Sequence, residues 1–139
     1  MKIHLYYVGR VRDLRIASAA AEYLQRASRW CRAELHQLDP RRADLWSRHA
    51  AARKILLDAG GRALDSGEFT ELVRQAELRG QDLVFVVGGA EGLPEGWRER
   101  ADLLLSLSPL TMAHELARLV LAEQIYRALA TLRGHPYPK

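Results

Sequence analysis

Two short loops hold the residues whose types and spacing best suit the binding of a small ligand. The apolar run Leu83–Val87 stops at Gly88 and Gly89, and a second run, Leu103–Leu107, stops at a Ser-Pro turn. Paired glycines permit a ligand to approach the backbone closely and allow backbone angles closed to other residues. The segment Leu107–Met112 offers backbone N–H and C=O groups between apolar side chains, a mixture that suits an adenine ring. Taken alone, a tight structural turn and a plain strand-to-helix connection explain the same residues.

Most familiar catalytic motifs are absent from the chain. There is no G-x-x-x-x-G-K-[ST] phosphate loop and no G-x-G-x-x-G after the first predicted strand, which argues against ATP and NAD. His114 and Glu115 do not begin a zinc motif of the H-E-x-x-H type, because position 118 is arginine. Cys31 is the only cysteine, which excludes an internal disulfide and a cysteine-based metal site. The five histidines do not have the spacing of metal ligands, so no metal site is predicted. They are His4, His36, His49, His114 and His135.

The hydrophobic pattern predicts an α/β fold that brings both loops to one edge of a sheet. Short apolar runs bounded by turn signals are typical of parallel strands buried on both faces, and here they alternate with helical periodicities. The predicted strands are residues 2–8, 33–38, 55–58, 83–87 and 103–107, and the predicted helices are 14–29, 43–53, 66–80 and 114–133. We expect Gly60 and Gly61 to end the third strand. The prediction is one domain, residues 1–139, with a mostly parallel sheet, helices on both faces and a ligand site at the carboxyl ends of the strands.

Composition sets broad limits on location and partners. The chain has 139 residues, 48% of them apolar, which is enough for one core. It has no run of eighteen apolar residues and no signal-like start, so we expect a soluble, cytoplasmic protein with no membrane partner. The net charge is +4, and arginine supplies 18 of the 21 basic side chains. This excess favours a polyanion such as RNA, although arginine-rich genome composition explains it equally well.

Several segments jointly carry a resemblance to a known family. They are VVGGAEGL (86–93), SLSPLTMAH (106–114), LARLVLAEQIYRA (116–128) and RGHPYPK (133–139), supported by VGRVRD (8–13) and LLDAGGRALDSGEF (56–69). In this order and at these spacings the chain resembles the SPOUT-class RNA methyltransferases. More closely, it is similar to the small bacterial family that methylates N3 of a pseudouridine in 23S rRNA. The similarity extends over most of the chain.

The resemblance implies a specific architecture and cofactor. It implies an α/β fold whose carboxyl-terminal part forms a trefoil knot, and a homodimer in which the knot region builds both the interface and the S-adenosylmethionine site. The helix His114–Arg133 agrees with a dimer, since it is apolar nearly all round. Carried over by motif, the cofactor residues are Leu57, Gly88, Leu107, Ser108, Pro109, Leu110, Thr111 and Met112.

The implied reaction assigns roles to residues at the start of that helix. Methylation of a uracil N3 requires loss of an imide proton and stabilisation of a ring anion. His114 is therefore the candidate base or base-orienting group, and Arg118, one turn later, the candidate anion or phosphate contact. Alternatively, His114 caps the helix and Arg118 pairs with Glu115. Glu123 and Arg127, spaced i,i+4, are predicted to form a structural ion pair.

The implied substrate is 23S rRNA, free or in the ribosome. The candidate RNA contacts are Arg10, Arg12 and Arg15 in one basic loop, and Arg133, His135, Tyr137 and Lys139 in the tail, which would reach the pocket of the other subunit. The chain departs from the family at Ala113, where proline is common, and at Pro138, where histidine is common. A second hypothesis is therefore a non-catalytic RNA- or ribosome-binding protein on the same fold.

Overall fold

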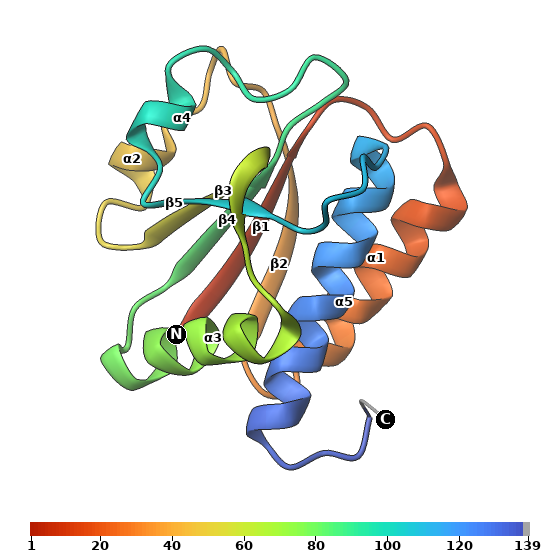
Figure 1. Ribbon diagram of the computed structural model, residues 1–139, viewed down its shortest axis with the longest axis vertical. Coiled ribbons are helices and arrows are strands. Elements are labelled where there is room, and N and C mark those ends of the chain that lie inside the picture. The colour runs from red at the N-terminus through yellow and green to blue at the C-terminus, as the bar shows by residue number, and fades with distance from the viewer. Residues whose placement is uncertain (138–139) are drawn as a thin grey trace.

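A computed structural model describes residues 1–137, which form a parallel α/β sheet flanked by helices (Figure 1). The elements are β1 (Lys2–Val8), α1 (Leu14–Ala27), β2 (Arg32–Leu38), α2 (Leu45–Arg48), β3 (Arg53–Ala63), α3 (Ser66–Arg79), β4 (Leu83–Val87), α4 (Trp97–Arg100), β5 (Leu103–Ser106) and α5 (His114–Leu132). The strand order is β2-β1-β4-β3-β5, and each pair of neighbouring strands is parallel. The predicted α/β class with a parallel sheet is confirmed. No helix within residues 1–137 is long and apolar enough to cross a membrane.

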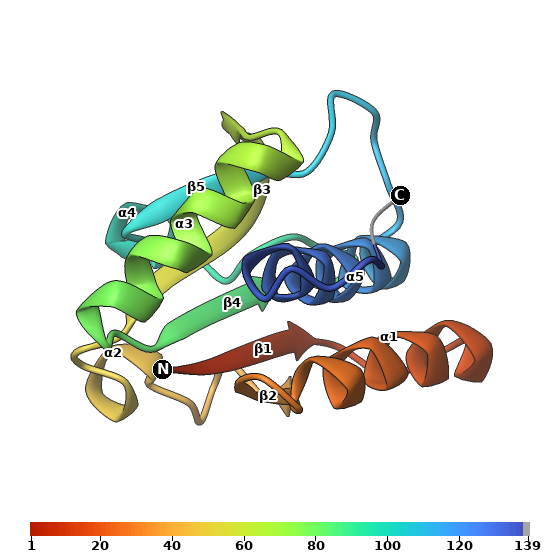
Figure 2. The same ribbon diagram turned by 90° about the horizontal axis from the view of Figure 1, so that it is seen from below.

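The two faces of the sheet are covered unequally. On one face, side chains of α1, α3 and α5 pack against Ile3, Leu5 and Phe85 in the larger core. Figure 2 shows α1 and α5 lying side by side along this face, as their contacts also indicate. The opposite face is covered by the one-turn helices α2 and α4, which contribute Leu45 and Trp97 to a smaller core. Helices therefore cover both faces, as predicted, but the three long helices share one of them.

Helix boundaries follow the capping residues in the sequence. The Asp13 carboxylate accepts from the Arg15 amide and caps α1. Asp65 caps α3 in a capping box with Glu68, and Gly80 ends that helix in the left-handed conformation.

Two predicted elements were wrong. The predicted helix 43–53 is only the single turn α2, since the chain enters β3 at Arg53. The third strand does not end at Gly60 and Gly61 but continues to Ala63, with a register shift between Leu57 and Arg62. A Cβ on Gly61 would lie 2.6 Å from the backbone of Leu104, so glycine here permits close approach of β5.

Candidate functional site

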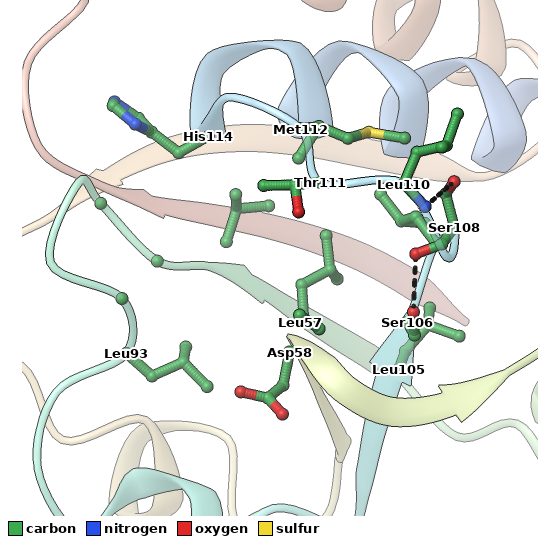
Figure 3. A pocket seen from close by; sticks show the side chains of 17 residues that line it. Leu57, Asp58, Leu93, Leu105, Ser106, Ser108, Leu110, Thr111, Met112 and His114 are labelled. Atoms are coloured by element: carbon green, nitrogen blue, oxygen red, sulfur yellow. Dashed lines mark hydrogen bonds between the residues drawn. The ribbon is translucent and has the colours of Figure 1, made fainter.

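The two loops that follow β4 and β5 meet at a pocket of about 300 Å³ at the carboxyl ends of the strands (Figure 3). The lining comes from the middle of β3, both loops and the first turn of α5. It consists of Leu57, Asp58, Ala59, Val87, Gly88, Gly89, Gly92, Leu93, Leu105, Ser106, Leu107, Ser108, Leu110, Thr111, Met112, His114 and Ala117. Seven of the eight residues expected to hold a cofactor thus lie around one cavity. The eighth, Pro109, is exposed on the same loop.

The glycine loop after β4 is held by its own backbone. The Gly92 amide donates to the Gly89 carbonyl at 2.9 Å, and Gly92 has a positive φ of 85°. A Cβ on Gly88 would lie 2.6 Å from the Gly92 carbonyl carbon, a contact that no larger residue can make without moving the loop. The structural-turn interpretation is therefore correct for these glycines, and the same turn forms one wall of the pocket.

The loop after β5 is fixed by serine side chains. The Ser106 hydroxyl donates to the Ser108 carbonyl at 3.1 Å, and the Leu110 amide donates to the Ser108 hydroxyl at 2.9 Å (Figure 3). These bonds hold a short turn whose apolar side chains, including Met112, line the cavity. The result is an apolar slot bordered by backbone polar groups, which suits a flat heterocycle.

Asp58 places a carboxylate in the pocket wall that the sequence analysis missed. It is the one acidic side chain of the lining within residues 1–137, and its carboxylate is only 16% exposed. Arg98 lies 2.9 Å from Oδ1, and the Gly60 amide donates to Oδ2 at 3.0 Å, so the carboxylate is held in one orientation. The only available signal was its place directly after Leu57. Because Arg98 offsets its charge, the carboxylate offers a ligand hydrogen-bond acceptors rather than an unpaired negative charge.

His114 lies between this pocket and a second cavity. The second cavity, of about 440 Å³, is lined by His114, by Arg10 and Arg12 of the β1–α1 loop, by Val8, Gly9 and Pro40, and by residues 89–95, which include Glu91 and Glu95. His114 is the first residue of α5, but the N-cap is Ala113, whose methyl group cannot accept a hydrogen bond. The alternative that His114 caps the helix is therefore wrong.

Glu115 joins the basic loop to α5. Its carboxylate accepts hydrogen bonds from the backbone amides of Arg12 and Asp13, the second at 3.2 Å. Glu115 is buried, and it serves the loop backbone rather than pairing with Arg118 as the alternative proposed. Through this clamp, the start of α5 determines where Arg10 and Arg12 lie.

Arg118 is buried on α5, with only 1% of its surface exposed. Its guanidinium carbon lies 3.7 Å from the centre of the Tyr7 ring, a cation–π contact. Its Nε and Nη2 have no hydrogen-bond partner among residues 1–137, and burial lowers its pKa. Arg118 is therefore near His114 along the helix but beneath the surface, with unused donors.

The other candidate RNA contacts lie elsewhere. Arg15 is exposed and paired with Asp13 beside the two arginines of the second cavity. Arg133, His135 and Tyr137 follow the far end of α5, which at 19 residues is about 28 Å long. One chain therefore does not bring the tail to its own pocket. The expected contact Lys139 lies outside the described residues.

Each described tail residue already has a partner within the chain. Arg133 lies 2.7 Å from Glu77, and the His135 ring packs edge-on against Trp30. The Tyr137 hydroxyl donates to Glu123 at 2.6 Å, and burial together with this bond raises the pKa of Tyr137. The predicted ion pair of Glu123 with Arg127 is confirmed at 2.9 Å.

Comparisons with known proteins identify relatives of the whole chain. A family model described as "Predicted SPOUT methyltransferase" matches residues 1–138. A ribosomal RNA large subunit methyltransferase H from Solibacter usitatus is 50% identical over 137 residues, which cover 99% of each chain.

Solved structures share the fold at low identity. A probable methyltransferase from Bordetella pertussis has a TM-score of 0.62 at 13% identity, covering 92% of this chain and 94% of that one. A putative methyltransferase from Legionella pneumophila, solved with bound S-adenosylmethionine, has a TM-score of 0.53 at 16% identity, covering 95% of this chain and 66% of that one.

Proposed function

This chain belongs to the SPOUT methyltransferase family, and from that premise we propose that it transfers a methyl group from S-adenosylmethionine to N3 of a pseudouridine in 23S rRNA. The class of substrate rests on the Solibacter relative, which is named a large-subunit ribosomal RNA methyltransferase and matches along its whole length. The arrangement of cavities within this chain supports the chemistry.

The pocket at the strand ends fits the cofactor. Its apolar lining and glycine wall suit an adenine ring, and the fixed carboxylate of Asp58 offers acceptors for the polar groups of a ligand. Leu57, Gly88 and the loop Leu107–Met112 would hold the group. When bound, S-adenosylmethionine supplies an activated methyl group on a sulfonium.

The single observation that carries the proposal is the pair of adjoining cavities with His114 in the wall of both. The second cavity presents Arg10 and Arg12, which suit the phosphates of a nucleotide. A base that is turned out of its RNA helix into this cavity would face the first pocket across the imidazole. We propose that His114 orients the base and takes or relays the imide proton at N3.

Arg118 is proposed to stabilise the developing negative charge. Its Nε and Nη2 lack partners among residues 1–137, and buried donors of this kind call for an explanation. An anion that forms next to His114 would lie within one helical turn of this guanidinium. The contact with Tyr7 keeps Arg118 in place meanwhile.

A homodimer would complete the site. Large apolar side chains are exposed around the start of α5, where Leu110 and Leu14 are each 79% exposed and Leu116 is 43% exposed. A second copy packed on this surface would cover them and bring one tail towards the other pocket. We therefore propose that Arg133, His135 and Tyr137 of one subunit serve the site of the other.

The trefoil knot is part of the same proposal. β5 lies at the sheet edge next to β3, whereas α5 packs against α1 on the far side of β4 (Figure 1). The segment 107–113 therefore carries the chain back across the strand ends, next to the loop 88–93. A threading of this segment through a loop would produce the knot and would hold both walls of the pocket together.

The direct test is methyl transfer to 23S rRNA or ribosomes from cells that lack the modification, with the product located by mass spectrometry. One methyl group at N3 of a pseudouridine is the expected result. Binding of S-adenosylmethionine without transfer, together with tight ribosome binding, would favour the non-catalytic RNA-binding hypothesis. A methyl group on another nucleotide would retain the enzyme but overturn the proposed substrate.

The role of His114 is tested separately. The substitution His114→Asn should lower the rate of methyl transfer by about 10²- to 10⁴-fold, the usual contribution of a positioned acid or base. Its dissociation constant for S-adenosylmethionine should change little. The control His49→Asn changes a histidine that lines neither cavity and should transfer methyl groups at the unaltered rate.

A further inference from the structure

Three side chains on the smaller face of the sheet converge away from the pocket. His4 lies on β1, and Glu34 and His36 lie on β2. One ligand-type atom from each of the three lies within 4.8 Å of the others. Their separation of about thirty positions along the chain is why no metal-ligand spacing is visible in the sequence.

The parallel register of β1 and β2 produces this cluster. His4 pairs with Glu34, and Tyr6 pairs with His36. Residues two apart on a strand share a face, so Glu34 and His36 point to the same side as His4. The cluster is therefore fixed by strands in the middle and at the edge of the sheet rather than by mobile loops.

Distances within the cluster match those between the ligands of a small metal ion. His4 Nδ1 lies 3.5 Å and His36 Nε2 lies 3.3 Å from the same oxygen, Glu34 Oε1. Ligand atoms about 2.0–2.2 Å from a zinc ion at tetrahedral angles lie about 3.4 Å from one another. The two separations from the Glu34 oxygen thus match those that coordination requires, and the two histidine ligand atoms lie within 4.8 Å of each other.

The buried His4 nitrogen also lacks a hydrogen-bond partner, as it would if a ligand were missing. His4 is 9% exposed, and its Nδ1 has no hydrogen-bond partner among residues 1–137. The other oxygen of the carboxylate, Glu34 Oε2, accepts from Arg32 Nε at 3.0 Å, which leaves Oε1 turned to the histidines. A carboxylate held by an outer partner in this way is common at metal sites.

His49 closes one side of the cluster. Its ring centre lies 4.6 Å from that of His4, and its Nε2 is hydrogen-bonded to the Tyr6 hydroxyl at 2.7 Å. His49 is not among the residues whose ligand-type atoms all lie within 4.8 Å of one another, so it forms a wall rather than a ligand. His36 and Glu34 are about a third exposed, so an ion can enter from solvent.

We propose that His4, Glu34 and His36 bind one divalent transition-metal ion, with Zn²⁺ as the best match. Two imidazoles and one carboxylate are a known zinc ligand set, whereas Mg²⁺ and Ca²⁺ prefer oxygen ligands alone. The fourth position is open to water. Such an ion links β1 to the edge strand β2 and stabilises their pairing on the face of the sheet that only α2 and α4 cover.

The test uses the full chain stripped of metal with a chelator and titrated with Zn²⁺ against a chromogenic competitor. One Zn²⁺ should bind per chain. His36→Asn should weaken binding by at least about tenfold, since loss of even an outer-shell partner costs about 10- to 100-fold in metal affinity. His135→Asn removes a histidine at the far end of α5 and should bind Zn²⁺ as the unaltered chain does.

A second readout guards against misfolding. His36 is partly exposed, so its variant should keep the circular dichroism spectrum of the unaltered chain, whereas changes at buried His4 risk the fold. Co²⁺ in place of Zn²⁺ should give the strong visible absorption of a four-coordinate ion in the unaltered chain and in the His135 variant only. Equal Zn²⁺ affinity in the folded His36→Asn variant, or no stoichiometric binding at all, would overturn the proposal.

Discussion

The two ends of α5 differ in how completely their polar groups are partnered. Towards the carboxyl end, Arg127 and the tail residue Tyr137 both bind the carboxylate of Glu123, which lies in the middle of α5. At the amino end, the N-cap is Ala113, and two nitrogens of Arg118 have no hydrogen-bond partner among residues 1–137. At the first of these ends, the charged and polar side chains are paired with one another within the chain. The other end leaves two buried donors without a partner among the described residues.

Packing shows the same contrast. The tail ring of Tyr137 lies edge-on to Tyr126 at 4.5 Å, and the Trp30 ring stacks on Tyr126 at 5.6 Å. The amino end instead borders two cavities and carries the exposed side chains of Leu110 and Leu116. A single helix thus provides stability at one end and a binding surface at the other, which is how a small domain keeps a site open without losing its core.

The largest expected effect comes from filling the pocket at the amino end. Thr111 lines the pocket from an exposed loop, so Thr111→Trp should place an indole in the cavity without disturbing the core. We expect the dissociation constant for S-adenosylmethionine to rise about 100-fold, or about 2.7 kcal/mol, as measured by calorimetry. Gly88 is a poorer test, since any side chain there would displace the loop itself.

The same substitution at the other end is the matched control. Thr131 is exposed in the last turn of α5, and Thr131→Trp should leave cofactor affinity unchanged. Melting temperatures of both variants would show that the fold is kept. Equal loss of affinity in the two variants would mean that the pocket depends on the whole helix, and the contrast between its ends would fail.

The next effect concerns the clamp between α5 and the basic loop. Glu115→Ala removes the acceptor of two backbone amides in a buried position, which should lower the free energy of unfolding by about 1–3 kcal/mol in urea denaturation. It should also weaken rRNA binding, because Arg10 and Arg12 lose their anchor. Glu115→Gln retains one acceptor oxygen, so its free energy of unfolding should lie between those of the unaltered chain and of the alanine variant. An alanine variant as stable as the unaltered chain would show that the loop holds itself.

Local sequence signals predicted most of the fold. Val84 and its four neighbours form an unbroken apolar run that became β4 without error, and the pairing of Asp65 with Glu68 marks the start of α3. The wrong predictions concern segments whose structure is decided by tertiary contacts. Ala- and Arg-rich residues 43–53 favour a helix by propensity, yet they turn early to enter β3, and Gly61 continues that strand because β5 approaches it closely.

The site was predictable only in part. Motif resemblance identified Gly88 and the loop 107–112, which the structure brings around one cavity. It did not identify Asp58. This residue lies where the register of β3 with β5 shifts, and local sequence patterns do not reveal such a shift. The cluster of His4 with Glu34 was likewise invisible, because it depends on the register between two strands.

At the carboxyl end, a smaller loss should follow from removing one hydroxyl. Tyr137→Phe keeps the ring packing but deletes the bond to Glu123, which should lower the free energy of unfolding by about 1–2 kcal/mol. Urea denaturation at neutral pH measures it. Unchanged stability would indicate that the tail leaves this contact in solution, as it must when it reaches the pocket of a partner subunit.

The smallest effect belongs to the last ion pair of the tail. Arg133 and Glu77 are each about a third exposed, and exposed pairs contribute only about 0–1 kcal/mol, so Arg133→Ala should scarcely change the urea midpoint. The control Arg74→Ala breaks an exposed pair with Glu71 on α3 and should behave alike. A loss above about 2 kcal/mol for Arg133 alone would exceed what a surface pair provides. It would mean that the carboxyl end of α5 is a coupled network, in which the tail is tied too firmly to serve a second subunit.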